Sequence, residues 1–221
     1  MSAHEVVFLS QNIAMPVRSV VFDFGNVIAF FDHGKACRQL ARLCRPAVDP
    51  GAIYDAVFKG GLEHDYDSGR VTTPQFLERL RTTLPLDATD ADIGTAWSDI
   101  FRPNEPVARL LPQLHSLGLR LVLGSNTNAL HHAWFSHEFA EPLSYFDAQV
   151  LSYRIGCRKP DRRFYEACID ASQCPVSACL YVDDRADLIE AAGLVGLRGV
   201  VYAPALDLNA LIEEERRAAS A

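Results

Sequence analysis

The spacing of the strand-like segments constrains the fold of this chain more than any other sequence feature. Short apolar runs bounded by small or polar residues predict five strands, at Ser19–Phe22, Leu119–Leu123, Ala148–Leu151, Ala178–Val182 and Gly199–Tyr202. The last four follow one another closely. Almost a hundred residues separate the first from the second, although a complete strand–helix–strand unit needs only about 30. Most of this stretch must therefore fold as something other than a simple crossover.

The helices expected between and after the later strands define the fold class. Apolar periodicity predicts them at Ala129–Phe139, Asp161–Ala171, Ala186–Leu194 and Leu206–Ala219. Strands that read as continuous apolar runs are typical of a parallel sheet buried on both faces. We therefore predict an α/β fold, with a Rossmann-like parallel sheet and helices on both of its faces.

The long stretch after the first strand is predicted to be helical. Turn signals separate four helical patterns, at Lys35–Leu43, Ala52–Phe58, Thr73–Leu80 and Asp90–Ile100. The chain then returns to the sheet through a crossover helix at Glu105–Leu117. We predict that residues 29–102 form an inserted helical cap domain, and that residues 1–28 and 103–221 form the α/β core.

Composition and charge argue against several classes of protein. The 221 residues include 28 acidic and 21 basic residues, for a net charge of −7, whereas nucleic-acid binding normally needs clustered Lys and Arg. No apolar run approaches the ~18 residues of a membrane helix, and residues 1–19 lack the pattern of a secretory signal. We expect a cytoplasmic protein whose six cysteines are free thiols. They are Cys37, Cys44, Cys157, Cys168, Cys174 and Cys179.

Polar residues follow four of the predicted strands, at the edge of a parallel sheet where ligands bind. Each could be structural instead, because carboxylates and hydroxyls cap helices and a loop lysine is usually solvated. Carboxylates placed together repel one another unless a cation joins them, however, and Mg²⁺ favours a few carboxylates together with phosphate and water. The residues are Asp23 after the first strand, Ser125 and Asn126 after the second, Lys159 after the third, and Asp183 and Asp184 after the fourth.

These residues lie in four motifs: DFGNV from Asp23, LGSNTN around Ser125, CRKPD around Lys159 and LYVDDRADLIEAA around Asp183 and Asp184. In this order and spacing the motifs resemble those of the haloacid dehalogenase-like (HAD) hydrolase superfamily, and the resemblance covers residues 18–205. The helical region between the first two motifs resembles the helical cap of that superfamily. Among the branches of that superfamily, the sequence resembles the phosphatase branch that includes glucose-1-phosphate phosphatases.

The resemblance implies a Mg²⁺-dependent phosphomonoesterase that acts on a small phosphorylated metabolite, such as a sugar phosphate, through an aspartyl-phosphate intermediate. Asp23 would be the nucleophile, and Lys159 would also take part in catalysis. The residues that bind the phosphoryl group would be Ser125, Asn126 and Lys159. The metal site would comprise Asp23, the backbone carbonyl of Gly25, Asp184, and Asp183 as a ligand or as a partner of the ligands.

One position departs from the pattern of the family's phosphatases, which usually carry a second aspartate two residues after the nucleophile as general acid. Here that position is Gly25, and a positioned acid is typically worth ~10²–10⁴ in rate. Either the substrate has a good leaving group, as an anomeric sugar phosphate does, or the cap supplies the acid. Candidates in the cap are His64, Asp65 and Asp67, within a polar stretch that otherwise predicts a solvated turn.

Two other functions remain open from the sequence. The first is a metal-independent 2-haloacid dehalogenase, because that branch of the superfamily also lacks the second aspartate. The Asp183–Asp184 pair argues against it, since two adjacent carboxylates at one site need a cation and the dehalogenase uses no metal. A non-catalytic phosphate-binding or interaction protein of the same fold is the other alternative. Nearby, His131 and His132 follow the second motif, and we expect them at the surface, with at most one facing the site.

Overall fold

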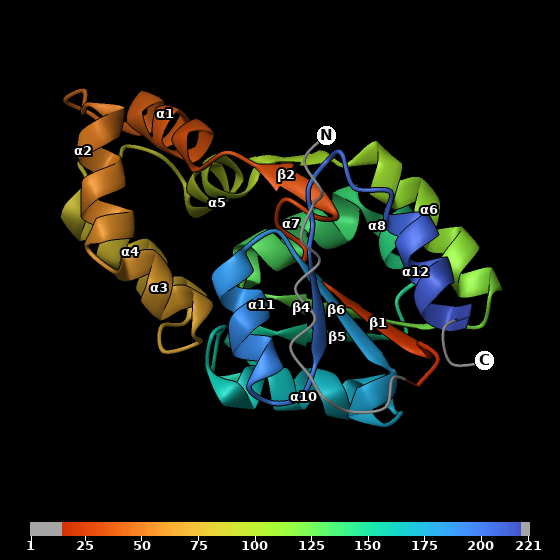
Figure 1. Ribbon diagram of the computed structural model, residues 1–221. Helices are drawn as coiled ribbons and strands as arrows, with labels where there is room; N and C mark the ends of the chain where they lie inside the picture. The colour runs from red at the N-terminus through yellow and green to blue at the C-terminus, as the bar shows by residue number, and fades with distance from the viewer. Residues whose placement is uncertain (1–14, 218–221) are drawn as a thin grey trace.

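The computed structural model describes residues 15–217 and contains a sheet of five parallel strands (Figure 1). The strand order is β5-β4-β1-β6-β7, so the first strand lies at the centre. Each strand matches a predicted one to within two residues, and the predicted α/β fold is confirmed. The strands are β1 (Ser19–Phe22), β4 (Arg120–Ser125), β5 (Ala148–Leu151), β6 (Cys179–Asp183) and β7 (Arg198–Val201).

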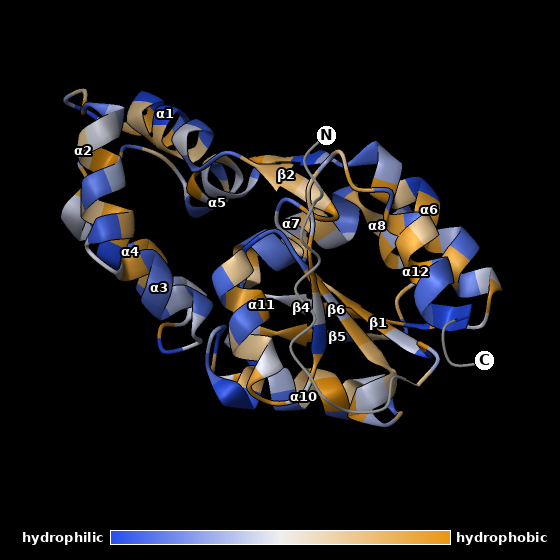
Figure 2. Ribbon diagram, in the orientation of Figure 1, coloured by the Kyte–Doolittle hydropathy of each residue, from blue (hydrophilic) through white to orange (hydrophobic). Residues whose placement is uncertain are grey.

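Helices cover both faces of the sheet, because alternate side chains of each strand point to opposite faces. Val20 and Phe22 lie in one hydrophobic core and Val21 lies in another. Figure 2 shows the central strands as largely hydrophobic. The first core is covered by α6 (Glu105–Ser116), α7 (Ala129–Glu138), α8 (Ala140–Leu143) and α12 (Leu208–Arg217), and the second by α10 (Arg162–Ser172) and α11 (Ala186–Gly193).

A helical insertion, residues 33–98, separates β1 from β4. It begins and ends at a two-stranded antiparallel sheet of β2 (Ala29–Phe31) and β3 (Phe101–Pro103). The insertion has a hydrophobic cluster of its own around Trp97, and Figure 1 shows its helices set apart from the layers of the sheet. They are α1 (His33–Leu43), α2 (Pro50–Tyr54), the π-helix η1 (Asp55–Lys59), α3 (Leu62–Asp67), α4 (Thr73–Thr83) and α5 (Asp90–Ser98).

A column of aromatic rings joins the insertion to α7. The ring centroids of Tyr66 and Phe76 are 4.2 Å apart, those of Phe76 and Trp97 4.9 Å, and those of Trp97 and His131 5.1 Å. The first three residues belong to the insertion, whereas His131 belongs to α7. Aromatic pairs at these distances contribute about 0.5–1.5 kcal/mol beyond the area that they bury. The column therefore fixes the insertion against one helix of the α/β layers.

Several short elements differ from the sequence prediction. β2 and β3 are not predicted, because strands of three residues are too short to show a periodic pattern. The stretch around His64 was expected to be a solvated turn, and this is wrong: it forms α3, because Leu62 and Tyr66 lie four residues apart and give it a buried face. A further short helix, α9 (Ser152–Ile155), and a 3-10 turn, η2 (Val176–Ala178), also escape the sequence patterns.

Parts of two expectations lie outside the described residues. The absence of a secretory signal concerns mainly residues 1–14, and the last two residues of the helix predicted to end at Ala219 also lie beyond residue 217. Among residues 15–217, no helix combines the length and the hydrophobicity that crossing a bilayer requires.

The two tryptophans allow the insertion's core to be tested. Trp97 is fully buried, and its replacement by alanine removes the centre of the aromatic column. We expect Trp97→Ala to lower the free energy of unfolding by about 3–5 kcal/mol. Trp134, which is only partly buried on α7, is the matched control, and Trp134→Ala should cost no more than about 1 kcal/mol. Urea unfolding followed by far-ultraviolet circular dichroism measures both; equal losses would contradict a core centred on Trp97.

Candidate active site

The ends of the three central strands bring the predicted site residues together. Phe22, the last residue of β1, is in register with Leu123 of β4 and Val182 of β6. The residues that follow at this edge, Asp23 and Asp183, are therefore neighbours. A cavity of about 200 Å³ opens here between the sheet and the insertion. Its lining includes six of the seven predicted residues, namely Asp23, Gly25, Ser125, Asn126, Lys159 and Asp184, together with Thr127 of the second motif.

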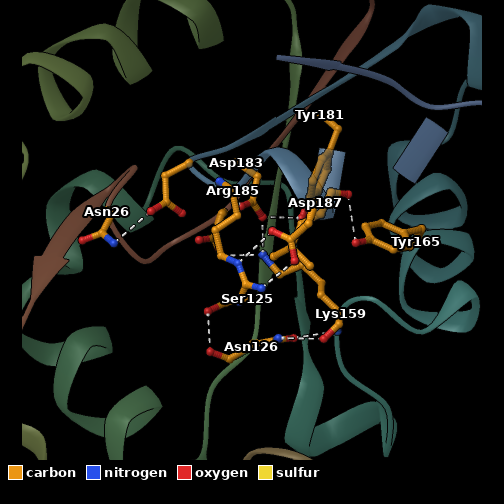
Figure 3. A network of polar contacts seen from close by, with 12 residues as sticks. Asn26, Ser125, Asn126, Lys159, Tyr165, Tyr181, Asp183, Arg185 and Asp187 are labelled. Carbon is orange, nitrogen blue, oxygen red and sulfur yellow. Dashed lines mark hydrogen bonds and ion pairs between the residues drawn. The ribbon is translucent and has the colours of Figure 1, made fainter. Parts of the chain in front are cut away.

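Lys159 lies at the centre of the site, between two carboxylates. Its Nζ donates to Asp23 Oδ1 at 2.7 Å. It also donates to Asp183 Oδ2 at 2.8 Å (Figure 3). Its side chain is 1% exposed, so the alternative of a solvated loop lysine is wrong. The two carboxylates raise the pKa of Lys159 above its ordinary value, although burial opposes them. The ammonium is thus charged and held in one place.

Asp183 supports the other groups of the site. Besides Lys159, its Oδ2 accepts a hydrogen bond from the Tyr181 hydroxyl at 2.9 Å, and its Oδ1 accepts one from the Arg185 backbone N–H at 3.0 Å. Both oxygens are therefore engaged within the protein. No sequence motif marks Tyr181 as a site residue, but its place two residues before Asp183 on one strand puts both side chains on the same face.

Asn126 holds the segment that carries Lys159. Its Oδ1 accepts from the Lys159 backbone N–H at 2.8 Å, and its Nδ2 donates to the Lys159 carbonyl at 3.1 Å (Figure 3). This side chain therefore joins the end of β4 to the lysine loop. Ser125 beside it is buried at the cavity wall, and its hydroxyl makes only a long contact of 3.4 Å to the Asn126 carbonyl. The Ser125 hydroxyl is thus the freer of the two to meet a ligand.

Three carboxylates converge beside the lysine. One oxygen each from Asp23, Asp183 and Asp184 lies within 4.8 Å of the others. Burial raises the pKa of Asp23 to about 7, although Lys159 lowers it, and the charges of Asp183 and Asp184 add to the rise. One ammonium does not balance three carboxylates, and hard oxygen donors of this kind fit Mg²⁺. The chemistry of the donor set thus matches a magnesium site.

Gly25 is tightly enclosed. A Cβ atom at this position would lie 2.8 Å from Cε1 of the Phe31 ring and 3.6 Å from Asp23 Oδ2. Contacts under about 3 Å are not tolerated without displacement of the neighbour. The absence of a side chain therefore lets Phe31 close over the residue next to Asp23.

The insertion supplies the opposite wall of the cavity. Phe31, His33, Glu63 and Asp67 line it. Asp67 is 4% exposed, unlike the solvated turn that the sequence predicts. The other two candidate acids lie elsewhere: His64 is exposed and accepts from Arg158 at 2.8 Å, and Asp65 pairs with Arg70 at 2.7 Å.

The two histidines after the second motif have different surroundings. His131 is buried, which corrects the expected surface position. Its Nε2 faces the Trp97 carbonyl at 3.2 Å and its Nδ1 faces the Asn128 amide at 3.1 Å. Burial lowers the pKa of His131 to about 3, so the ring is neutral. His132 lies partly exposed beside Tyr153, at 3.1 Å from its hydroxyl, in agreement with the surface role expected for it.

Sequence comparisons place the chain among hydrolases. A family model described as haloacid dehalogenase-like hydrolase matches residues 17–196. The chain is 31% identical over 177 residues to a D-ribitol-5-phosphate phosphatase of Bacteroides thetaiotaomicron, with 76% of this chain and 83% of the relative covered. It is 29% identical over 188 residues to Phosphatase MT3486 of Mycobacterium tuberculosis, with 83% and 86% covered.

Solved structures share the fold at lower identity. A HAD family enzyme from Bacteroides thetaiotaomicron, in complex with magnesium and inorganic phosphate, superposes with a TM-score of 0.76 at 19% identity, covering 88% of this chain and 98% of the other. An L-2-haloacid dehalogenase from Xanthobacter autotrophicus superposes with a TM-score of 0.60, also at 19% identity, covering 90% and 82%. The fold is therefore common to enzymes of different chemistry.

The raised pKa of Asp23 predicts a stability that depends on pH. Its ordinary value is 3.8 and its value in the folded protein is about 7, so folding disfavours the ionised carboxylate. This cost is absent below the ordinary value, grows as the pH rises between the two, and is complete above about 7. In metal-free buffer, Asp23→Asn should therefore raise the free energy of unfolding by about 1–4 kcal/mol above pH 7 and by much less near pH 4.

Urea unfolding in the presence of EDTA across this pH range measures the difference. Asp32→Asn, at an exposed carboxylate, is the control and should not show this gain. A loss of stability in Asp23→Asn above pH 7 would mean that the ion pair with Lys159 outweighs the cost of burial.

Proposed function

Because the chain belongs to the haloacid dehalogenase-like hydrolase family, we propose that it is a Mg²⁺-dependent phosphomonoesterase that acts on a small phosphorylated metabolite. The observation that carries the proposal is the cavity in which a buried lysine and three carboxylates meet. The lysine and a divalent cation together would offset the charge of both the carboxylates and a phosphate. The phosphatase names of two relatives support this choice of reaction.

Asp23 is the proposed nucleophile. A carboxylate that attacks phosphorus divides hydrolysis into two easier steps, through a covalent aspartyl phosphate that water then cleaves. Lys159 holds one Asp23 oxygen at 2.7 Å, which leaves the other carboxylate oxygen for the attack. The Ser125 hydroxyl and the Lys159 ammonium bind phosphoryl oxygens, and Asn126 keeps the Lys159 segment in place.

Asp23, the Gly25 carbonyl and Asp184 would hold Mg²⁺, with Asp183 as the partner that orients the site. When bound, the ion neutralises charge on the phosphoryl oxygens, which is the main requirement of phosphoryl transfer. Asp184 is already oriented, because its Oδ2 accepts from Asn26 Nδ2 at 2.9 Å. Asp183 has both oxygens engaged by protein donors, which suits a supporting role better than direct coordination.

The helical insertion acts as a cap in this proposal, with residues 29–102 as the cap domain and the remainder as the core. Its side chains form the wall opposite the nucleophile, so substrate would enter between the two parts, and closure would exclude water. The wall offers polar groups, including His33 and Glu63, that suit a substrate with hydroxyl groups. A sugar or polyol phosphate is therefore the substrate class that we propose.

The six cysteines bear on the compartment. All of them lie in the described part of the chain, where all are free, and five are buried. Free thiols persist in reducing compartments, which supports the proposal of a cytoplasmic protein.

A phosphate-release screen tests the activity. We expect wild-type protein with Mg²⁺ to release phosphate from members of a panel of sugar and polyol phosphates, and EDTA to abolish the release. Asp23→Asn should reduce turnover to the detection limit while the circular dichroism spectrum stays unchanged, because the amide is not a nucleophile. Asp32→Asn serves as control. Wild-type rates in Asp23→Asn, after mass spectrometry excludes deamidation, would contradict the mechanism.

The same experiment separates the phosphatase from the dehalogenase alternative. Halide release from 2-haloacids that survives EDTA, without phosphate release from any member of the panel, would replace our proposal by a dehalogenase. The absence of both activities would favour a non-catalytic binding protein.

Substitutions of two neighbouring carboxylates, Asp184 and Asp187, test the proposed metal site. Asp184→Asn should raise the Mg²⁺ concentration needed for half-maximal activity by at least about tenfold, since even loss of a supporting partner costs 10–100-fold. Asp187→Asn is the matched control, because Asp187 is exposed and pairs with Arg185 at 2.6 Å. Isothermal titration of Mg²⁺ gives a second readout. An unchanged Mg²⁺ requirement in Asp184→Asn would remove this residue from the site.

A further inference from the structure

The proposed reaction needs a proton donor that the sheet edge does not supply. When the bond between phosphorus and an alkyl oxygen breaks, the leaving oxygen must gain a proton, because an alkoxide is a poor leaving group. Gly25, two residues after the nucleophile, has no side chain, and the Phe31 ring lies against it. The donor must therefore come from another wall of the cavity.

Most titratable groups of that cavity are unsuited to this task. Lys159 is bound by two carboxylates. His131 is neutral, and its two ring nitrogens face Trp97 and Asn128 rather than the cavity's centre. His33 is stacked on Phe58, with ring centroids 4.4 Å apart, and burial lowers its pKa, which disfavours the imidazolium form that would donate a proton. The carboxyl groups of the insertion remain.

Asp67 is the carboxyl group that the fold fixes most firmly. It is the last residue of α3, and its Oδ1 accepts from Asn128 Nδ2 at 2.9 Å. Its backbone carbonyl accepts from the Ser152 hydroxyl at 2.6 Å, and that hydroxyl also accepts from the Thr127 N–H at 2.9 Å. Asp67 is thus tied to the segment that directly follows Ser125 and Asn126, on the same cavity as Asp23.

The surroundings of Asp67 favour its protonated form. Burial raises its pKa well above the ordinary value, and the nearby charge of Glu63 raises it further. The Asn128 hydrogen bond and the Arg158 charge lower it, but to a smaller extent than burial raises it. Because Asn128 Nδ2 donates to Oδ1, Oδ2 is the oxygen available to hold the proton.

We propose that Asp67, delivered by the helical insertion, is the general acid and base of the reaction, in place of the side chain that Gly25 lacks. The inference rests on the phosphatase function proposed above. As Asp23 forms its bond to phosphorus, the Oδ2 proton of Asp67 passes to the leaving oxygen and the alcohol departs. The Asp67 carboxylate then takes a proton from the water that attacks the aspartyl phosphate, which releases phosphate and restores both aspartates.

The other two candidate general acids of the polar stretch, Asp65 and His64, are placed less favourably. Asp65 is partly exposed, pairs with Arg70 at 2.7 Å and Arg79 at 3.6 Å, and does not line the cavity of Asp23. His64 is exposed, accepts from Arg158 at 2.8 Å and does not line the cavity of Asp23. Asp67 alone of the three is buried, is held in one orientation by Asn128 and lines the cavity that contains Asp23.

Leaving-group dependence tests the proposal. We expect Asp67→Asn, which preserves shape, to lower kcat/KM for a primary alkyl phosphate such as ribitol 5-phosphate by about 10²–10⁴. For p-nitrophenyl phosphate, whose leaving group needs no proton, the loss should stay below about tenfold. Asp65→Asn is the matched control and should leave both values unchanged. Equal losses on the two substrates in Asp67→Asn would overturn the proposal and indicate a structural role.

A second variant keeps the proposal testable if Asp67→Asn does not fold. Glu63→Gln retains Asp67 and removes the charge that raises its pKa, so the alkaline limb of kcat/KM for the alkyl phosphate should shift to lower pH. An unmoved limb would overturn the assignment. Failure of wild-type protein to release phosphate from either ester with Mg²⁺ present would instead contradict the proposed function.

Discussion

The ion pair of Lys159 with Asp23 and Asp183 is the interaction on which the site depends. A buried ammonium joins the residues that follow β1 and β6 to a loop that Asn126, at the end of β4, holds by two hydrogen bonds. Without the ammonium, two buried carboxylates would lose their partner, and breaking a buried pair in this way typically costs about 3–5 kcal/mol. The geometry of three strand ends is therefore coupled to one side chain. The remaining excess of negative charge is what makes the site receptive to a cation.

The cavity lies where the α/β layers meet the helical insertion, and each of these parts has its own hydrophobic packing. The sheet supplies the nucleophile and the carboxylates, whereas the insertion supplies the wall with Asp67. The aromatic column that ends at His131 and the Asn128–Asp67 hydrogen bond join the two parts within a few residues of each other. Because Asn128 contacts both His131 and Asp67, the helix that follows Ser125 serves as the common support. Asn128 and His131 therefore both help to pack the insertion against the α/β layers and fix the geometry of the site.

The sequence predicted the sheet and the helices that follow β1, because both depend on the periodicity of apolar residues. The resemblance of the four motifs to those of HAD hydrolases is confirmed. What the sequence could not rank was burial. Lys159 next to a proline has the pattern of an exposed loop residue, and Asp67 within GLEHDYDSGR has the pattern of a solvated turn, yet contacts from distant segments bury both. β2 and β3 were not predicted for a different reason, because a strand of three residues is too short to show a periodic hydrophobic pattern. The roles assigned to the individual site residues remain proposals.

The close approach of Phe31 to Gly25 has a consequence for how this protein can diverge. A single substitution that introduces aspartate at position 25 would place a Cβ atom 2.8 Å from the aromatic ring. The ring would have to turn away, and Phe31, which is 37% exposed, has room to turn toward solvent. That movement would open the cavity beside Asp23, as would a smaller residue at position 31. A side chain gained at position 25 would therefore reshape the wall of the cavity at the same time as it supplied an acid, so catalysis and substrate fit would change in one mutation.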